Sequence, residues 1–201
     1  RGLVPYNILH HQAMRSRKFF ILDELTKVLY MSVCVGSLIP RKGFERLIHV
    51  CGLLKSRGYH FHLLILGKGE LYEELAEQVI DEHLLDSVQL LGFRDNPYPY
   101  MAAADLYVCP SYVEGFSTVV SEAVVLETPV VTTDCSGMRE ILGDSEYGLI
   151  TQNTEESLFE GLRTMLDKPE VYQYYQQRVR ERAPFFYMEE RLKAYEEILD
   201  Q

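Results

Sequence analysis

Residues 31–67 read MSVCVGSLIPRKGFERLIHVCGLLKSRGYHFHLLILG, and this stretch decides the fold. The apolar run 31–36 ends in glycine, as a strand that enters a loop does. Residues 43–57 carry apolar side chains at helical spacing on one face, and a second apolar run covers 61–66. Strand, helix and strand in this order predict parallel pairing, because a parallel connection needs a crossover.

The same alternation continues toward the C-terminus. We expect further strands at 88–91, 106–109, 129–133 and 148–150, with helices near 71–80, 97–104, 118–126 and 138–142. The pattern predicts an α/β fold, a Rossmann-like doubly wound parallel sheet with helices on both faces. We assign residues 31–185 to this domain, 1–30 to a linker and 186–201 to a C-terminal helix, with Pro169 and Pro184 dividing the helical tail into three helices.

Composition limits the classes of function. The chain has 201 residues, 47% of them hydrophobic, which suits one sizeable core but not two full α/β domains. The 30 acidic against 20 basic residues give a net charge of −10, which argues against nucleic-acid and anionic-membrane binding. The four cysteines form no C-x-x-C pair, no D-x-D occurs and no window of 18 apolar residues exists. We expect neither a metal site nor a transmembrane segment, and a cytoplasmic location.

The most informative loop is residues 110–123, which read PSYVEGFSTVVSEA. Ligands of open parallel sheets bind beyond the carboxyl ends of the strands, where this loop lies. Glu114 is in the loop and Glu122 is about one turn inside the next helix, so both carboxylates can approach one crevice. Gly115 lets the backbone come close to a ligand, while Ser117 and Thr118 supply a cap and free N–H groups. On spacing alone, a solvated loop glutamate and a helix-start glutamate explain the pair equally well.

Two other strand-to-helix loops contain glycine and basic residues. The loop 36–43 places Arg41 and Lys42 beside a helix start, where they would bind a diphosphate, although an ordinary basic turn is the simpler interpretation. It is not a Walker A loop, because its lysine precedes the glycine. Gly67 and Gly69 begin like a dinucleotide fingerprint, but Tyr72 takes the place of the third glycine, which argues against a nicotinamide enzyme.

Together these segments resemble the C-terminal, donor-binding domain of retaining GT-B glycosyltransferases of family 4, also called group 1. The resemblance runs from about Ser32 to Tyr187 and includes the E-x7-E signature, with Glu114 and Glu122 as its glutamates. Its other motifs are GSLIPRKG at 36–43, LGKG at 66–69, LGF at 91–93, ADLYVCPS at 104–111 and TPVV at 128–131.

The resemblance implies a role for each matching residue. Glu114 would contact hydroxyls of the transferred sugar and Lys42 would neutralise the diphosphate, which makes these two the expected catalytic residues. Glu122 would accept hydrogen bonds from the ribose. The remaining donor-binding residues that it implies are Gly36, Ser37, Arg41, Gly67, Gly69, Phe93, Arg94, Gly115, Phe116, Ser117 and Thr118.

The resemblance also implies a substrate and a partner, and the sequence departs from the family pattern at one position. The donor would be a nucleotide-sugar, with UDP first and GDP next, used without a metal and with retention on a glycan or lipid-linked acceptor. An N-terminal domain of the same full-length chain would supply the acceptor site, so these residues alone would be inactive, and peripheral attachment to the inner membrane face is left open. Ser37 stands where the family usually has arginine, with Arg41 as a substitute cation. A non-catalytic nucleotide-sugar-binding module and a sugar-nucleotide epimerase of the same architecture are the alternatives.

Overall fold

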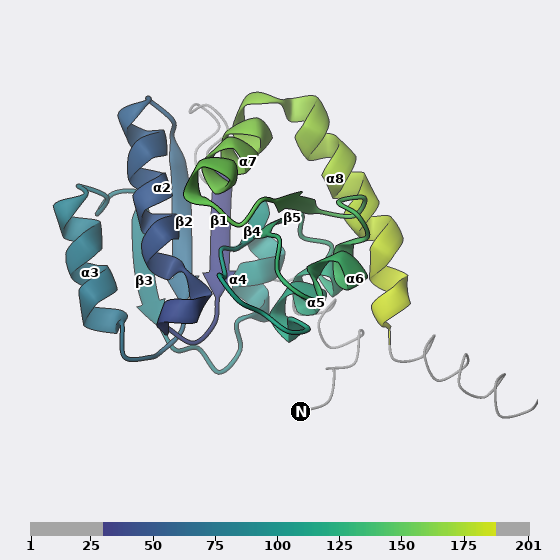
Figure 1. The fold of residues 1–201 in the computed structure, drawn as a ribbon, viewed down its shortest axis with the longest axis horizontal. Helices are drawn as coiled ribbons and strands as arrows, with labels where there is room; N and C mark the ends of the chain where they lie inside the picture. Colours follow the sequence, from purple (N-terminus) through teal and green to yellow (C-terminus); the bar gives the residue numbers. More distant parts are fainter. Residues whose placement is uncertain (1–29, 188–201) are drawn as a thin grey trace, which may run out of the picture.

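The computed structural model describes residues 30–187 (Figure 1). Within them the six strands form one parallel sheet in the order β3-β2-β1-β4-β5-β6. The strands are β1 (Tyr30–Val35), β2 (Phe61–Leu66), β3 (Val88–Gly92), β4 (Leu106–Cys109), β5 (Val130–Thr133) and β6 (Leu149–Thr151). This order confirms the predicted doubly wound sheet.

Helices cover both faces of the sheet, as predicted. They are η1 (Pro40–Lys42), α2 (Phe44–Ser56), α3 (Tyr72–Asp81), α4 (Tyr98–Ala103), α5 (Thr118–Val125), α6 (Met138–Leu142), α7 (Glu155–Asp167), α8 (Pro169–Arg182) and η2 (Ala183–Phe186). One core cluster joins the sheet to α2, α3 and α7, and the other joins it to α4, α5, α6 and η2. The apolar face predicted for residues 43–57 is buried in the first cluster.

The structure departs from the predictions in two places. The 3-10 helix η1 precedes α2, and Gly43 separates the two with a left-handed backbone (φ 65°). A three-residue helix leaves no apolar periodicity in the sequence, so the pattern could not show it. At the C-terminal end, α8 begins at Pro169 as predicted, but it stops two residues before Pro184, which lies within η2 rather than between two helices. The linker at 1–30 and the last predicted helix, 186–201, fall almost wholly outside the described residues.

The topology brings two of the predicted loops together. Strands β1 and β4 are neighbours at the centre of the sheet, and the chain leaves them in opposite directions along the sheet order. The loops that follow them therefore meet at the switch point, where doubly wound folds bind ligands. Their contact is close, because a Cβ added to Gly43 would lie 2.2 Å from the carbonyl oxygen of Pro110.

Candidate functional site

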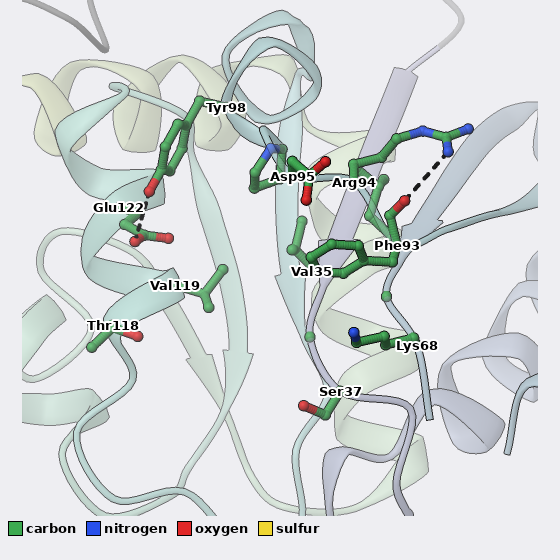
Figure 2. A pocket seen from close by; sticks show the side chains of 14 residues that line it. Val35, Ser37, Lys68, Phe93, Arg94, Asp95, Tyr98, Thr118, Val119 and Glu122 are labelled. Atoms are coloured by element: carbon green, nitrogen blue, oxygen red, sulfur yellow. Dashed lines mark hydrogen bonds between the residues drawn. The ribbon is translucent and has the colours of Figure 1, made fainter. Parts of the chain in front are cut away.

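A cleft of about 680 Å³ lies at the carboxyl ends of the strands (Figure 2). Its walls come from the ends of β1, β2 and β3, from the start of α4 and from the first turns of α5. The predicted residues that line it are Gly36, Ser37, Gly67, Phe93, Arg94, Thr118 and Glu122. The lining that sequence reasoning missed is Val35, Leu66, Lys68, Asp95, Pro97, Tyr98 and Val119.

The glycines of one wall are required by backbone contacts. A Cβ on Gly67 would lie 1.9 Å from the carbonyl oxygen of Gly36, and one on Gly69 would lie 2.2 Å from that of Leu38. The loops after β1 and β2 therefore pack directly on each other. Gly69 does not itself line the cleft, so the structure gives it a packing role.

Glu122 holds the opposite wall, one turn into α5. It is half-buried, and the hydroxyl of Tyr98 donates a hydrogen bond of 3.2 Å to its Oε1 (Figure 2). Burial raises the pKa of the Glu122 carboxyl, and the hydrogen bond from Tyr98 lowers it in part. Burial, together with the charge of Glu122, raises the pKa of Tyr98 to about 12. The phenol therefore remains a donor across the neutral range.

The N-terminus of α5 opens into the same cleft. Ser117 is the N-cap, as predicted, and its Oγ accepts the backbone N–H of Val120 at 3.4 Å. Thr118 and Val119, the next residues, line the cleft. First-turn N–H groups have no acceptor inside their own helix, so this end of α5 suits an anion.

Glu114 lies in a smaller hollow that adjoins the cleft. It forms an ion pair with Lys42, and Ser111 Oγ donates to the same Oε1 at 2.9 Å. The Glu114 side chain is only 7% exposed and that of Lys42 18%. Val35 and Val119 line both hollows, so they form the shared wall. The two glutamates thus face neighbouring hollows, and the expectation of one common crevice needs this correction.

Arg41 lies apart from the cleft. Its side chain is exposed and is not part of the lining, and its carbonyl oxygen accepts the N–H groups of Tyr112 and Val113 at 2.9 and 3.4 Å. Lys68 lines the cleft instead. Its backbone carbonyl accepts the N–H of Leu38, the residue after Ser37. Its Nζ lies 4.5 Å from the ring centroid of Phe93. Sequence reasoning included Lys68 in the LGKG motif at 66–69 but gave its side chain no role.

Gly115 and Phe116 are exposed on the loop before α5 and stand outside the lining. A Cβ on Gly115 would meet nothing within 4 Å, so the surface over this glycine is open. Its carbonyl oxygen packs against Gly137, where a Cβ would approach it to 2.5 Å. The loop therefore packs on Gly137 on one side and is open to solvent on the other.

Arg46 is a buried cation that sequence reasoning missed. It is 1% exposed, and its Nε donates to the Pro110 carbonyl at 2.6 Å. Its terminal nitrogens donate to Asn153 Oδ1 at 2.8 Å and Thr133 Oγ1 at 3.3 Å, and its guanidinium lies 3.8 Å from the ring centroid of Tyr112. Burial lowers its pKa. These contacts fix the loop that carries Glu114 to the helix that follows Lys42.

Residues 30–187 contain no group of three or more His, Cys, Asp and Glu side chains that could hold a metal ion. Among the helices of that same range, none combines the length and the apolar character needed to cross a membrane.

Comparison with known sequences identifies relatives across most of the chain. The model of the family "Glycosyl transferases group 1" matches residues 22–182. An N-acetylgalactosamine-N,N'-diacetylbacillosaminyl-diphospho-undecaprenol 4-alpha-N-acetylgalactosaminyltransferase of Campylobacter jejuni is 39% identical over 154 residues, which are 76% of this chain and 41% of that protein. The capsular polysaccharide biosynthesis glycosyltransferase CapM of Staphylococcus aureus is 30% identical over 122 residues, 59% of this chain and 31% of that one. This chain thus spans well under two thirds of these relatives.

Solved structures share the fold at low sequence identity. HepE of Anabaena, solved in complex with UDP, superposes with a TM-score of 0.78 at 19% identity, over 98% of this chain and 56% of that one. The C-terminal domain of LpcC, a group 1 protein of Francisella tularensis, gives a TM-score of 0.72 at 17% identity, over 92% of this chain and 98% of that domain. The latter match shows that the fold of this chain corresponds to a separately crystallised domain.

Proposed function

Because the chain belongs to the glycosyl transferases group 1 family, we propose that its cleft binds the nucleoside diphosphate of an activated sugar, with UDP as the nucleotide. The observation that carries the proposal is the position of Glu122 and the α5 N-terminus on one wall of the cleft. The wall offers N–H donors for phosphate and a carboxylate acceptor for hydroxyls. The complex of the structural neighbour HepE with UDP supports the choice of nucleotide.

The lining suggests a place for each part of the donor. The diphosphate lies at the N-terminus of α5, next to Thr118, and the ribose lies against Glu122. The base lies toward Phe93 and Arg94, where an exposed aromatic ring and a guanidinium provide stacking surfaces. Lys68, beside Ser37, supplies a cation on that side of the cleft, and this role replaces the one expected of Arg41.

The sugar is proposed to lie at the mouth of the adjoining hollow, next to the ion pair of Lys42 and Glu114. When the nucleotide-sugar binds, the two residues of that pair contact different parts of it. The diphosphate attracts Lys42, and the sugar hydroxyls donate hydrogen bonds to Glu114. In transfer, the bond from the anomeric carbon to the diphosphate breaks and negative charge grows on the leaving oxygen. Lys42 and the α5 N-terminus stabilise that charge.

Transfer is proposed to retain the anomeric configuration. The acceptor oxygen bonds to the anomeric carbon on the face that the diphosphate leaves, and the acceptor proton passes to the departing phosphate oxygen. The protein's own groups supply this chemistry without a metal. The acceptor is proposed to be a glycan or a lipid-linked sugar, as the names of the Campylobacter and Staphylococcus relatives suggest.

The acceptor site is proposed to lie on a further domain of the full-length protein, because this chain covers about two fifths of the Campylobacter relative. Residues 1–201 alone are then expected to bind donor without turnover. NMR of the product made by the full-length protein tests retention. A product with inverted anomeric configuration would reject that step while leaving the binding proposal intact.

Calorimetric titration of the chain with UDP, GDP, ADP and CMP tests the binding proposal. We expect one diphosphate, UDP, to bind in preference, and Glu122→Ala to weaken it about tenfold or more, the usual effect of losing a hydrogen bond to a charged group. Glu140→Ala is the matched control, because Glu140 is an exposed helical glutamate outside the cleft. Absence of binding by any nucleotide, or equal UDP affinity in wild type and Glu122→Ala, would contradict the proposal.

A further inference from the structure

Tyr98 is the residue of the cleft that contacts Glu122 directly. It is the first residue of α4, and its ring packs against the core cluster that contains α5. Its hydroxyl donates to Glu122 Oε1 at 3.2 Å, and both side chains line the cleft (Figure 2). The two residues are 24 positions apart in sequence and come from different helices.

The hydrogen bond limits what both groups can offer a ligand. A glutamate has three rotatable side-chain bonds, and a bond to an anchored ring restricts them before a ligand arrives. Because the phenol proton is directed to Glu122, the phenol oxygen has only lone pairs left. The carboxylate likewise has only acceptor capacity. The wall formed by Tyr98 and Glu122 therefore presents acceptors and suits a ligand group that donates hydrogen bonds.

We propose that Tyr98 is a positioning residue for Glu122 and makes this wall selective for a ribose over a deoxyribose. The inference rests on the proposed function, in which the ribose lies against Glu122. A ribose carries two neighbouring hydroxyl donors, and each deoxyribose lacks one of them. When the ligand lacks a hydroxyl, a fixed acceptor is left without a hydrogen bond, whereas a mobile acceptor can turn to bind water. The loss of binding free energy is therefore larger for the fixed acceptor. The raised pKa of Tyr98 keeps its proton available throughout the neutral range.

Tyr98→Phe is the substitution that isolates the hydroxyl. It keeps the ring in the core cluster, so packing is preserved and only the hydrogen bond to Glu122 is lost. Tyr100→Phe makes the same chemical change two residues on in α4, at a half-buried position outside the cleft lining. Thermal melts of the three proteins establish that each is folded.

The experiment is calorimetric titration of wild type, Tyr98→Phe and Tyr100→Phe with UDP, 2′-deoxy-UDP and 3′-deoxy-UDP. We expect wild type and Tyr100→Phe to prefer UDP over at least one deoxy form by about tenfold, the effect of one hydrogen bond to a charged group. In Tyr98→Phe that preference should fall to about twofold, with UDP binding about fivefold weaker and the deoxy nucleotide almost unchanged. If Tyr98 contributed only packing, Tyr98→Phe would change the affinities for UDP and both deoxy forms by the same factor, and their ratios would stay the same.

A double-mutant cycle with Glu122→Ala, which removes the acceptor of the Tyr98 hydroxyl, shows whether Tyr98 acts through Glu122. If it does, Tyr98→Phe should change UDP affinity less than twofold, on the order of measurement error, when Glu122 is already replaced by alanine. An unchanged ratio of UDP to deoxy-UDP affinity in Tyr98→Phe would overturn the inference alone. Failure of wild type to bind any of the three nucleotides would overturn the proposed function and the inference with it.

Discussion

Replacing Arg46 with methionine tests how the loop of residues 110–117 is held against α2. Methionine keeps most of the apolar stem, so the guanidinium and its contacts are the main loss. Of its three acceptors, Thr133 Oγ1 keeps a bond to the Ser111 carbonyl, and Asn153 is exposed enough to bond water. The Pro110 carbonyl, which is bonded at 2.6 Å in a buried position, loses its side-chain donor.

The expected magnitude follows from these contacts. An unsatisfied buried carbonyl costs about 1–3 kcal/mol, and losing the cation–π contact with Tyr112 costs about 0.5–2 kcal/mol. Removing a buried charge recovers part of that sum, because the guanidinium no longer has to be desolvated. We therefore expect Arg46→Met to lower the free energy of unfolding by about 2 kcal/mol.

Urea titration followed by circular dichroism measures this difference. Arg163→Met is the matched control, since Arg163 is 41% exposed and its ion pairs lie along α7. Such surface pairs contribute about 0–1 kcal/mol, so that variant should stay close to wild type. If Arg46→Met were as stable as Arg163→Met, the Arg46 contacts would not be what holds the loop, and the reasoning would be refuted.

Three further substitutions have defined outcomes. Burial raises the pKa of Glu122, so the folded state binds this proton more tightly than the unfolded chain and the ionised carboxylate costs stability above its folded pKa. Glu122→Gln should then raise the melting temperature at neutral pH, and the gain should shrink as pH falls to the ordinary glutamate range; a gain independent of pH would contradict this. Gly43→Ala should destabilise the fold more than Gly58→Ala, because both glycines have positive φ but only the Cβ at 43 meets a backbone oxygen, at 2.2 Å; urea midpoints that coincide would show that the contact is harmless. Lys42→Met should cost about 1–3 kcal/mol by leaving Glu114 buried without its cation, and Glu114→Gln in the same chain should recover part of it; additive losses in urea would argue against the pair.

Much of the fold could be predicted because the sequence alternates strongly between two periods. The strands at 61–66 and 106–109 and the helix at 138–142 agree with the structure to the residue. Apolar β-branched runs and amphipathic stretches are signals that local sequence carries by itself. The 3-10 helix η1 carries no such signal.

The site could be predicted in part, because loop glycines and paired carboxylates are visible in sequence. Arg46 could not, because a charged residue of an amphipathic helix is ordinarily assigned to the solvent-facing side. The loop after β4 covers that side, and such long-range contact leaves no trace in helical spacing. Tyr98 was missed for the same reason, since its contact with Glu122 joins two helices.

The roles of the remaining predicted residues stay predictions. Gly115 and Phe116 are exposed beside the cleft, and a bound sugar would show whether their backbone groups contact it. The linker assignment, the cytoplasmic location and the domain that would supply the acceptor site also await a test.

The most direct test of the account is to locate a bound nucleotide. Amide chemical shifts of the isotope-labelled chain, recorded by NMR during a UDP titration, report which residues the ligand reaches. We expect the largest changes on the cleft at Gly36, Ser37, Thr118 and Glu122, with smaller changes near Lys42. Saturable changes confined to another surface, with those amides unmoved, would contradict the assignment of the cleft as the donor site.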